Sequence, residues 1–121
     1  MLSLEPDFQL AEQITSEAAQ QGSLTPQQAE WIEAFYRNVE NRMLNLYDAA
    51  RLGAWWIYNR KDIAAYWGEQ TEWFNTQLFY TRRLEKELLA IGVPEQPALR
   101  SAVQTLSDIV EACRGAYELL A

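Results

Sequence analysis

Residues 53–67, GAWWIYNRKDIAAYW, decide how this chain folds. The segment Pro26–Pro94 contains no internal proline, so its sequence alone could form one very long helix. Two residues argue against that helix: Asn59 tolerates the left-handed backbone that ends helices, and Asp62 is a good N-cap for a following helix. The stretch therefore predicts a helix break within Tyr58–Ile63, followed by a return of the chain.

The same stretch predicts how the two helices pack. In an antiparallel hairpin around this break, residues whose numbers sum to roughly 121 lie opposite each other. Under this pairing Trp67 faces Gly53, and Trp56 faces Ala64. Large side chains then meet small ones, as close packing requires. Most of the tryptophan cluster is thus interpreted as packing within the hairpin.

Helical signals continue on both sides of this hairpin. Thr25, Pro26 and Gln28 form a capping-box arrangement, and Gly22 and Gly92 suit helix C-termini. Apolar residues recur at 3–4 spacing in each segment. We expect four helices, at about residues 6–21, 25–58, 63–91 and 97–121. The prediction is an all-α fold, an up-down antiparallel bundle of three long helices and a shorter N-terminal one, in a single domain covering residues 1–121.

Composition excludes several chemistries. The chain has 121 residues and no histidine, which rules out Ser-His-Asp and Cys-His nucleophiles and histidine-ligated metals. Its single cysteine, Cys113, lies on an apolar face, where cysteine usually behaves as a small hydrophobe. No signal peptide or apolar run of about 20 residues is present, so we expect a cytoplasmic location and no membrane partner. We also expect no cofactor.

Charge is distributed unevenly along the chain. The net charge is −7, and residues 1–40 contain seven acidic side chains against one basic one. No basic stripe is available for a phosphate backbone, so direct nucleic-acid binding is not expected. The acidic third, especially Glu12, Glu17, Glu30 and Glu33, is predicted to face solvent or a basic protein partner.

Three carboxylate pairs have the i, i+3 spacing that places both acids on one helical face. All-α nucleotide pyrophosphohydrolases hold magnesium with similar clusters. Here, however, Glu72, Asp108 and Glu111 fall opposite the apolar faces of their helices, and the double-acid start of that family's motif is missing. A solvated surface is the preferred interpretation, with a carboxylate-metal hydrolase as the less favoured alternative. The pairs are Glu30/Glu33, Glu69/Glu72 and Asp108/Glu111.

A few polar and aromatic residues beside the apolar faces suggest a pocket between the second and third helices. Arg42 lies at the edge of its apolar face, within reach of Tyr80 in the hairpin. Glu85 could be the ionic partner of Arg42 only with some shift of the hairpin register. Aromatic residues recur every seven positions along the third helix, which is more typical of core or subunit contact than of a cofactor site. The candidate pocket comprises Arg42, Trp67, Trp73, Tyr80 and Glu85.

Four large apolar residues fall on polar helix faces, where burial within one bundle would not explain them. They are Leu44, Leu52, Trp55 and Phe79. We expect them to form a contact surface for a second copy of this chain or for another protein. The sequence as a whole favours a non-enzymatic protein–protein interaction module, either a homodimer or a subunit of a larger assembly. The alternative is a small-molecule sensor or carrier that uses the aromatic pocket.

Overall fold

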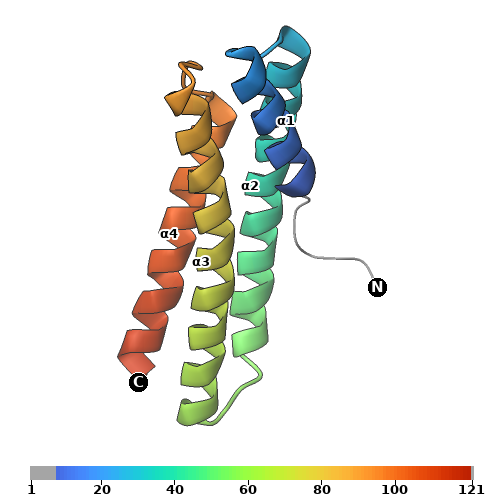
Figure 1. Cartoon of the computed structure of the whole chain (residues 1–121). Helices are drawn as coiled ribbons and strands as arrows, with labels where there is room; N and C mark the ends of the chain where they lie inside the picture. The colour runs from blue at the N-terminus through green and yellow to red at the C-terminus, as the bar shows by residue number, and fades with distance from the viewer. Residues whose placement is uncertain (1–7, 121) are drawn as a thin grey trace.

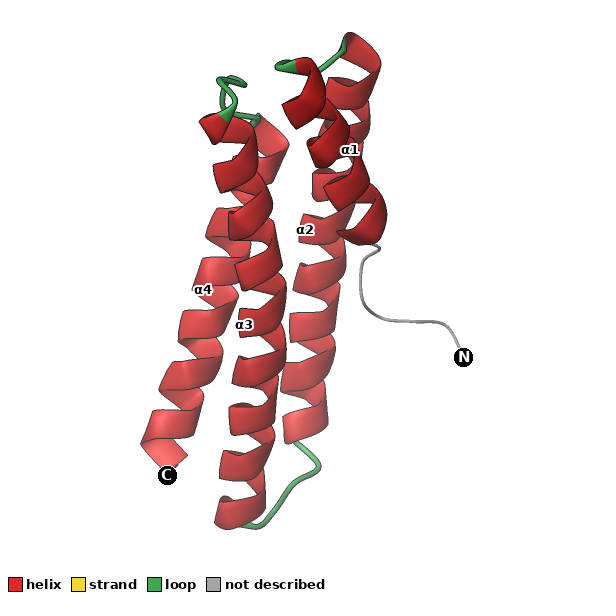
Figure 2. Cartoon of the chain, in the orientation of Figure 1, coloured by secondary structure: helices red, strands yellow, loops and turns green. Residues whose placement is uncertain are grey.

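The computed structural model describes residues 8–120, which form a bundle of four α-helices (Figure 1). The helices are joined by short connections, drawn green in Figure 2. This arrangement confirms the predicted all-α up-down bundle. The helices are α1 (Phe8–Gln21), α2 (Pro26–Ala54), α3 (Arg60–Ala90) and α4 (Pro97–Leu120).

Most helix ends lie where the local signals predict them. α1 ends at Gln21 and is followed by Gly22, whose φ of 80° favours glycine. The capping box of α2 is formed in full: the Thr25 hydroxyl accepts the Gln28 amide at 3.2 Å, and the Gln28 side-chain oxygen accepts the Thr25 amide at 2.9 Å. α3 ends just before Gly92, where φ is 83°. The predicted start of the first helix, at residue 6, lies outside the described residues.

The break between α2 and α3 comes earlier than the predicted Tyr58–Ile63. α2 already ends at Ala54, and the amides of residues 55–57 bond to carbonyls three residues back, which makes a tight turn. Asn59, and not Asp62, is the N-cap of α3, because its side chain accepts the amides of both Lys61 and Asp62. Asn and Asp cap equally well, so the residue that comes first in the chain starts the helix. Asp62 then lies in the first turn, where the helix dipole favours an acid.

The lateral packing of the helices differs from the predicted hairpin. α4 packs extensively against both α3 and α2, α1 packs against α3, and α2 and α3 scarcely approach each other. α2 and α3 thus occupy opposite corners of the bundle (Figure 1). The reason lies in α4, which buries eight residues and carries small ones among them, so that it approaches both neighbours closely.

Side chains nevertheless bridge α2 and α3 in nearly the predicted register. The Tyr66 hydroxyl donates to the Ala50 carbonyl at 2.7 Å, and the rings of Tyr47 and Phe74 lie 6.4 Å apart. The residue numbers sum to 116 for Tyr66 and Ala50 and to 121 for Tyr47 and Phe74, close to the predicted sum of roughly 121. Trp67 is buried as expected, but Trp56 is 78% exposed, so the predicted contact of Trp56 with Ala64 is wrong. Trp56 lies in the turn, beyond the last helical residue of α2, where helical phase no longer directs its side chain.

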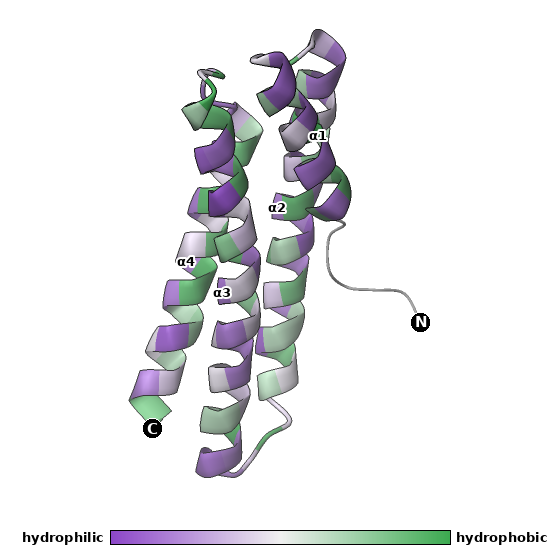
Figure 3. Ribbon diagram, viewed as in Figure 1, coloured by the Kyte–Doolittle hydropathy of each residue, from purple (hydrophilic) through white to green (hydrophobic). Residues whose placement is uncertain are grey.

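The core is apolar along most of its length, and hydrophobic and hydrophilic residues alternate along each helix in Figure 3. Three polar residues are also buried in it: Thr15, Gln77 and Thr81. The hydroxyls of Thr15 and Thr81 are satisfied locally, because each donates to the carbonyl four residues earlier in its own helix.

Among the described helices, α1 is much the shortest. α1 has 14 residues and α3 has 31, which at 1.5 Å per residue are about 21 Å and about 46 Å. α1 therefore covers only the end of the bundle that carries the α1–α2 and α3–α4 connections, at the top of Figure 1. Below we call this the upper half. The lower half ends at the α2–α3 connection.

Candidate functional site

The most exposed apolar side chains gather at the lower end of the bundle. Trp55, Trp56 and Tyr58 are 81%, 78% and 91% exposed, and Leu52 of the last α2 turn is 67% exposed. All four lie within seven residues at the end of α2 and in the turn that follows it. We call these four residues the aromatic tip.

The tip rests on an ordered scaffold. Hydrogen bonds hold the turn at residues 55–57, and the Asn59 cap fixes the start of α3. The guanidinium of Arg60 donates to the carbonyls of Leu119 and Leu120 at 3.3 and 3.2 Å, which fastens the end of α4 beside the start of α3. These carbonyls belong to the last turn of α4, where no intrahelical donor is available. The arginine thereby joins the two helices that support the turn.

A shallow hollow adjoins the tip on the bundle side. Its volume is about 410 Å³, and the residues that line it are Arg51, Ala54, Trp55, Ile57, Ile63 and Trp67. The buried ring of Trp67 forms part of this hollow. Charged side chains of both signs are exposed nearby: Arg51, Lys61 and Asp62. An apolar centre with a mixed-charge rim is the usual anatomy of a protein interface.

The four predicted interface residues are all exposed, but they do not form one face. Phe79 lines a separate hollow of about 370 Å³ on α3, among Arg82, Arg83 and Lys86. Because α2 and α3 occupy opposite corners, Phe79 and Trp55 belong to different surfaces. Leu44 is 42% exposed on α2. Helical phase missed Trp56 and Tyr58, since both lie in the turn, whose position could be predicted only approximately.

The five predicted pocket residues are distributed over several places. Trp73 lines a hollow of about 330 Å³ with Leu46, Glu69, Gln70 and Phe74. Trp67 lines the other hollow, beside the tip. The Tyr80 ring packs at 5.7 Å from Phe8 of α1. Glu85 pairs with Arg100 of α4 at 3.8 Å rather than with Arg42, which is exposed. Glu85 lies on the side of α3 that contacts α4, and helical phase alone could not identify that neighbour.

The acidic first third is used partly inside the fold, which corrects the expectation that Glu33 faces solvent. The Glu33 carboxylate is half-buried and accepts the Ala98 amide at 3.1 Å, so it caps the start of α4 from α2. Glu40 accepts the Thr105 hydroxyl at 2.9 Å, one heptad further along both helices. Glu12 lies 3.9 Å from Arg83. Glu17 and Glu30 are exposed.

Two buried groups have perturbed acidities. Burial, and then the nearby carboxylates of Glu12 and Glu87, raise the pKa of Tyr36 far above its usual value, so its hydroxyl is neutral. Burial raises the pKa of the Cys113 thiol to about 11. A thiol that stays protonated is a poor nucleophile. Among residues 8–120, no three acidic or cysteine side chains lie close enough together to hold a metal ion.

Comparisons with protein-family models, with curated proteins and with solved structures found no match for this chain. No described helix is both long and apolar enough to cross a bilayer.

Proposed function

We propose that this chain is a non-enzymatic protein–protein interaction module that self-associates through the aromatic tip. The observation that carries the proposal is the exposure of three aromatic side chains close together in the chain, Trp55, Trp56 and Tyr58, on a hydrogen-bonded turn. Folding does not require them to be there, since none contributes to the buried core. Exposed tryptophan and tyrosine on a rigid scaffold are typical anchors of protein interfaces.

The size of the tip fits a protein contact. A large aromatic side chain presents about 150–250 Å² of surface, so the three exposed rings offer roughly 500 Å² together. A standard interface buries about 800 Å² on each partner. Leu52 and the adjoining hollow supply part of the remainder. The partner that we favour is a second copy of this chain.

The rim of the tip supports pairing of two copies. Lys61 and Asp62 are neighbours, exposed, and of opposite charge. A two-fold axis through the tip would set Lys61 of each copy against Asp62 of the other. Exposed Glu17 and Glu30 lie in the acidic third, away from the tip, and under this proposal they remain available to a basic partner.

A small-molecule carrier remains the second candidate. It is favoured by the hollow of about 330 Å³ between α2 and α3, which combines the Trp73 and Phe74 rings with the polar Gln70 and Glu69. Mixed apolar and polar lining of this size is typical of small-ligand sites. Native mass spectrometry distinguishes the candidates, because a co-purifying ligand adds a small fixed mass and a dimer doubles the mass.

Sedimentation equilibrium of three proteins tests the proposal. We expect the wild type to be dimeric at tens of micromolar and a Trp55→Glu, Trp56→Glu double variant to be monomeric. Phe79→Glu is the matched control, since it also places an acid at an exposed aromatic position but away from the tip. It should dimerise as the wild type does. A monomeric wild type would exclude self-association, and equal weakening by Phe79→Glu would exclude the tip as its site.

A further inference from the structure

The hollow at Phe79 lies on an exposed face of α3 in the upper half of the bundle, beside α1. Its volume is about 370 Å³, and Leu78 and Phe79 supply the apolar part of its wall. Phe79 is 61% exposed, so folding does not bury its ring. The ring packs edge-to-face against Tyr80 at 5.8 Å, and Tyr80 packs against Phe8 of α1 at 5.7 Å. Neighbouring aromatic rings thus hold Phe79 in place at the surface.

The same hollow gathers positive charge. Arg82, Arg83 and Lys86 line it, together with one acid, Glu87. These three are among only ten basic residues in a chain whose net charge is −7. An acidic chain that concentrates bases around one exposed aromatic ring offers a local site for negative charge.

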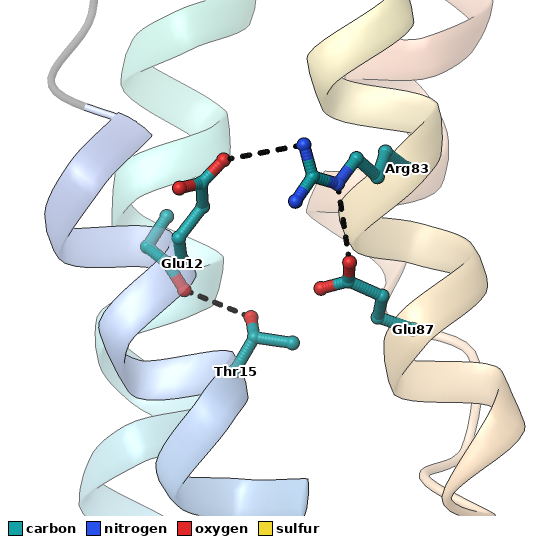
Figure 4. Close-up of polar contacts among 5 residues, drawn as sticks. Glu12, Thr15, Arg83 and Glu87 are labelled. Carbon is teal, nitrogen blue, oxygen red and sulfur yellow. Dashed lines mark hydrogen bonds and ion pairs between the residues drawn. The ribbon is translucent and has the colours of Figure 1, made fainter.

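Ion pairs within the described part of the chain engage one of these three bases. The Nε atom of Arg83 lies 3.2 Å from the Glu87 carboxylate, and its Nη1 atom lies 3.9 Å from Glu12 of α1, as Figure 4 shows. Arg82 and Lys86 form no ion pair with any carboxylate of residues 8–120. Two of the three positive charges are therefore uncompensated among the described residues.

The positions of Arg82 and Lys86 are unfavourable for α3 itself. The two residues are four apart, so their like charges lie on one helix face and repel each other. The helix dipole does not offset this repulsion, because α3 ends at Ala90 and neither base lies in its last turn. An anion between the two side chains relieves the repulsion, so the folded chain gains more from an anion here than at an isolated base.

The spacing of the ring and the two free bases suits a ligand with an apolar body and a charged head. Arg82 and Lys86 follow Phe79 along the helix axis by about 4.5 Å and about 10.5 Å. Side chains on a helix lean towards its N-terminus, so both bases incline towards the ring. A volume of about 370 Å³ lies at the small end of the range for small-molecule sites.

We propose that this hollow binds a small amphiphilic organic anion. The apolar body of the ligand lies on Phe79 and Leu78, and its anionic head, a carboxylate, sulfonate or phosphate, lies between Arg82 and Lys86. The ligand is a free molecule and not an anionic membrane surface, because the net charge of −7 opposes the approach of the whole chain to such a surface. The hollow is separate from the aromatic tip and from the hollow at Trp73, so the inference does not depend on the proposed function.

Fluorescence titration with two matched probes tests the proposal. The first probe is 8-anilinonaphthalene-1-sulfonate, and the second is N-phenyl-1-naphthylamine, which has the same rings without the sulfonate. Both are titrated into the wild type and into the Trp55→Glu, Trp56→Glu variant, in which probe cannot collect on the aromatic tip. We expect the sulfonate probe to bind with a Kd on the order of 30 µM, as is usual for a ligand of about 20 non-hydrogen atoms, and the uncharged probe to bind about ten-fold more weakly.

Charge removal then locates the site. Arg82→Gln, Lys86→Gln should weaken binding of the sulfonate probe about ten-fold or more, since one ion contact at about 4 Å is worth about five-fold even at the dielectric constant of water. The same double variant should leave binding of the uncharged probe unchanged. The matched control is Arg42→Gln, Lys61→Gln, which removes two exposed bases elsewhere and reaches the same net charge. It should leave the affinity within about two-fold, because salt screens distant charges. Phe79→Ala should weaken binding of both probes.

Three results would overturn the proposal. Equal affinity of the two probes would show that the anionic head contributes nothing. Equal weakening by the control variant would show that net charge, and not the hollow, attracts the probe. Absence of saturable binding of the sulfonate probe up to about 1 mM would show that the hollow is not a ligand site.

Discussion

Gly53 and Tyr66 offer a quantitative test of how α2 and α3 meet. A Cβ atom added at Gly53 would lie 2.9 Å from the Tyr66 hydroxyl oxygen and 3.7 Å from the adjacent ring carbon. The same hydroxyl donates to the Ala50 carbonyl at 2.7 Å. Gly53→Ala must therefore displace this hydroxyl oxygen, and the ring to which the oxygen is rigidly bonded must shift with it.

Two opposing contributions set the expected change in stability. Replacing glycine by alanine in a helix stabilises by up to about 1 kcal/mol, because the unfolded chain loses freedom. Loss of the Tyr66–Ala50 hydrogen bond costs about 0.5–1.5 kcal/mol. The two nearly cancel, so Gly53→Ala should change the free energy of unfolding by less than about 0.5 kcal/mol. In a Tyr66→Phe background no hydroxyl remains, and the same substitution should stabilise by nearly 1 kcal/mol.

The assay is a double-mutant cycle in urea, followed by circular dichroism. We expect a coupling energy of about 1 kcal/mol between the two sites. Gly115→Ala is the control, because no atom lies within 4 Å of its added Cβ, and it should stabilise the wild type and the Tyr66→Phe variant equally. If Gly53→Ala stabilises the wild type as much as Gly115→Ala does, Tyr66 does not bridge to α2 and the described contact is wrong.

Three further substitutions or conditions test other parts of the fold. Trp67→Ala should lower the free energy of unfolding by about 3–5 kcal/mol, as emptying a buried aromatic site does. Trp55→Ala should lower it by less than about 1 kcal/mol, because its ring is exposed. Both variants are measured by denaturant unfolding, and equal losses would contradict the burial assigned to Trp67. Glu33→Ala removes the acceptor of the Ala98 amide and should cost about 1 kcal/mol, while Glu33→Gln keeps an oxygen and should cost less; hydrogen exchange at the start of α4 should rise more in the alanine variant. The pKa of Cys113 is about 11 in the folded chain against a reference value of 9.0, so the unfolded thiol ionises first and the free energy of unfolding should fall as pH rises above about 9. The control is Cys113→Ala, which should lack this contribution to the fall. Rapid alkylation of the folded wild type at pH 8 would contradict the burial of the thiol.

The helices themselves were determined by local sequence. The Thr25–Gln28 capping box, the glycines at positions 22 and 92, and the apolar periodicity of α4 each depend on interactions within a few residues. Such signals operate in any tertiary context, so helix number, type and most ends could be predicted. The exposure of Leu52 followed from the same helical phase, and Trp55, at the C-cap of α2, is exposed as predicted. The break after α2 was displaced by several residues because two good caps, Asn59 and Asp62, lie close together in the sequence.

Only the tertiary structure decided which helices are neighbours. Periodicity shows which side of a helix is apolar, but it does not show which other helix covers that side. The adjacent pair α2 and α3 could form a close hairpin, yet α4, with its wide face of small and branched residues, packs more closely against each of them. Because α4 packs against both helices, Glu33 of α2 accepts an amide at the start of α4, and Glu85 of α3 pairs with Arg100 of α4. It also placed Phe79 and Trp55 on different surfaces, because their relative position depends on contacts between residues far apart in the chain.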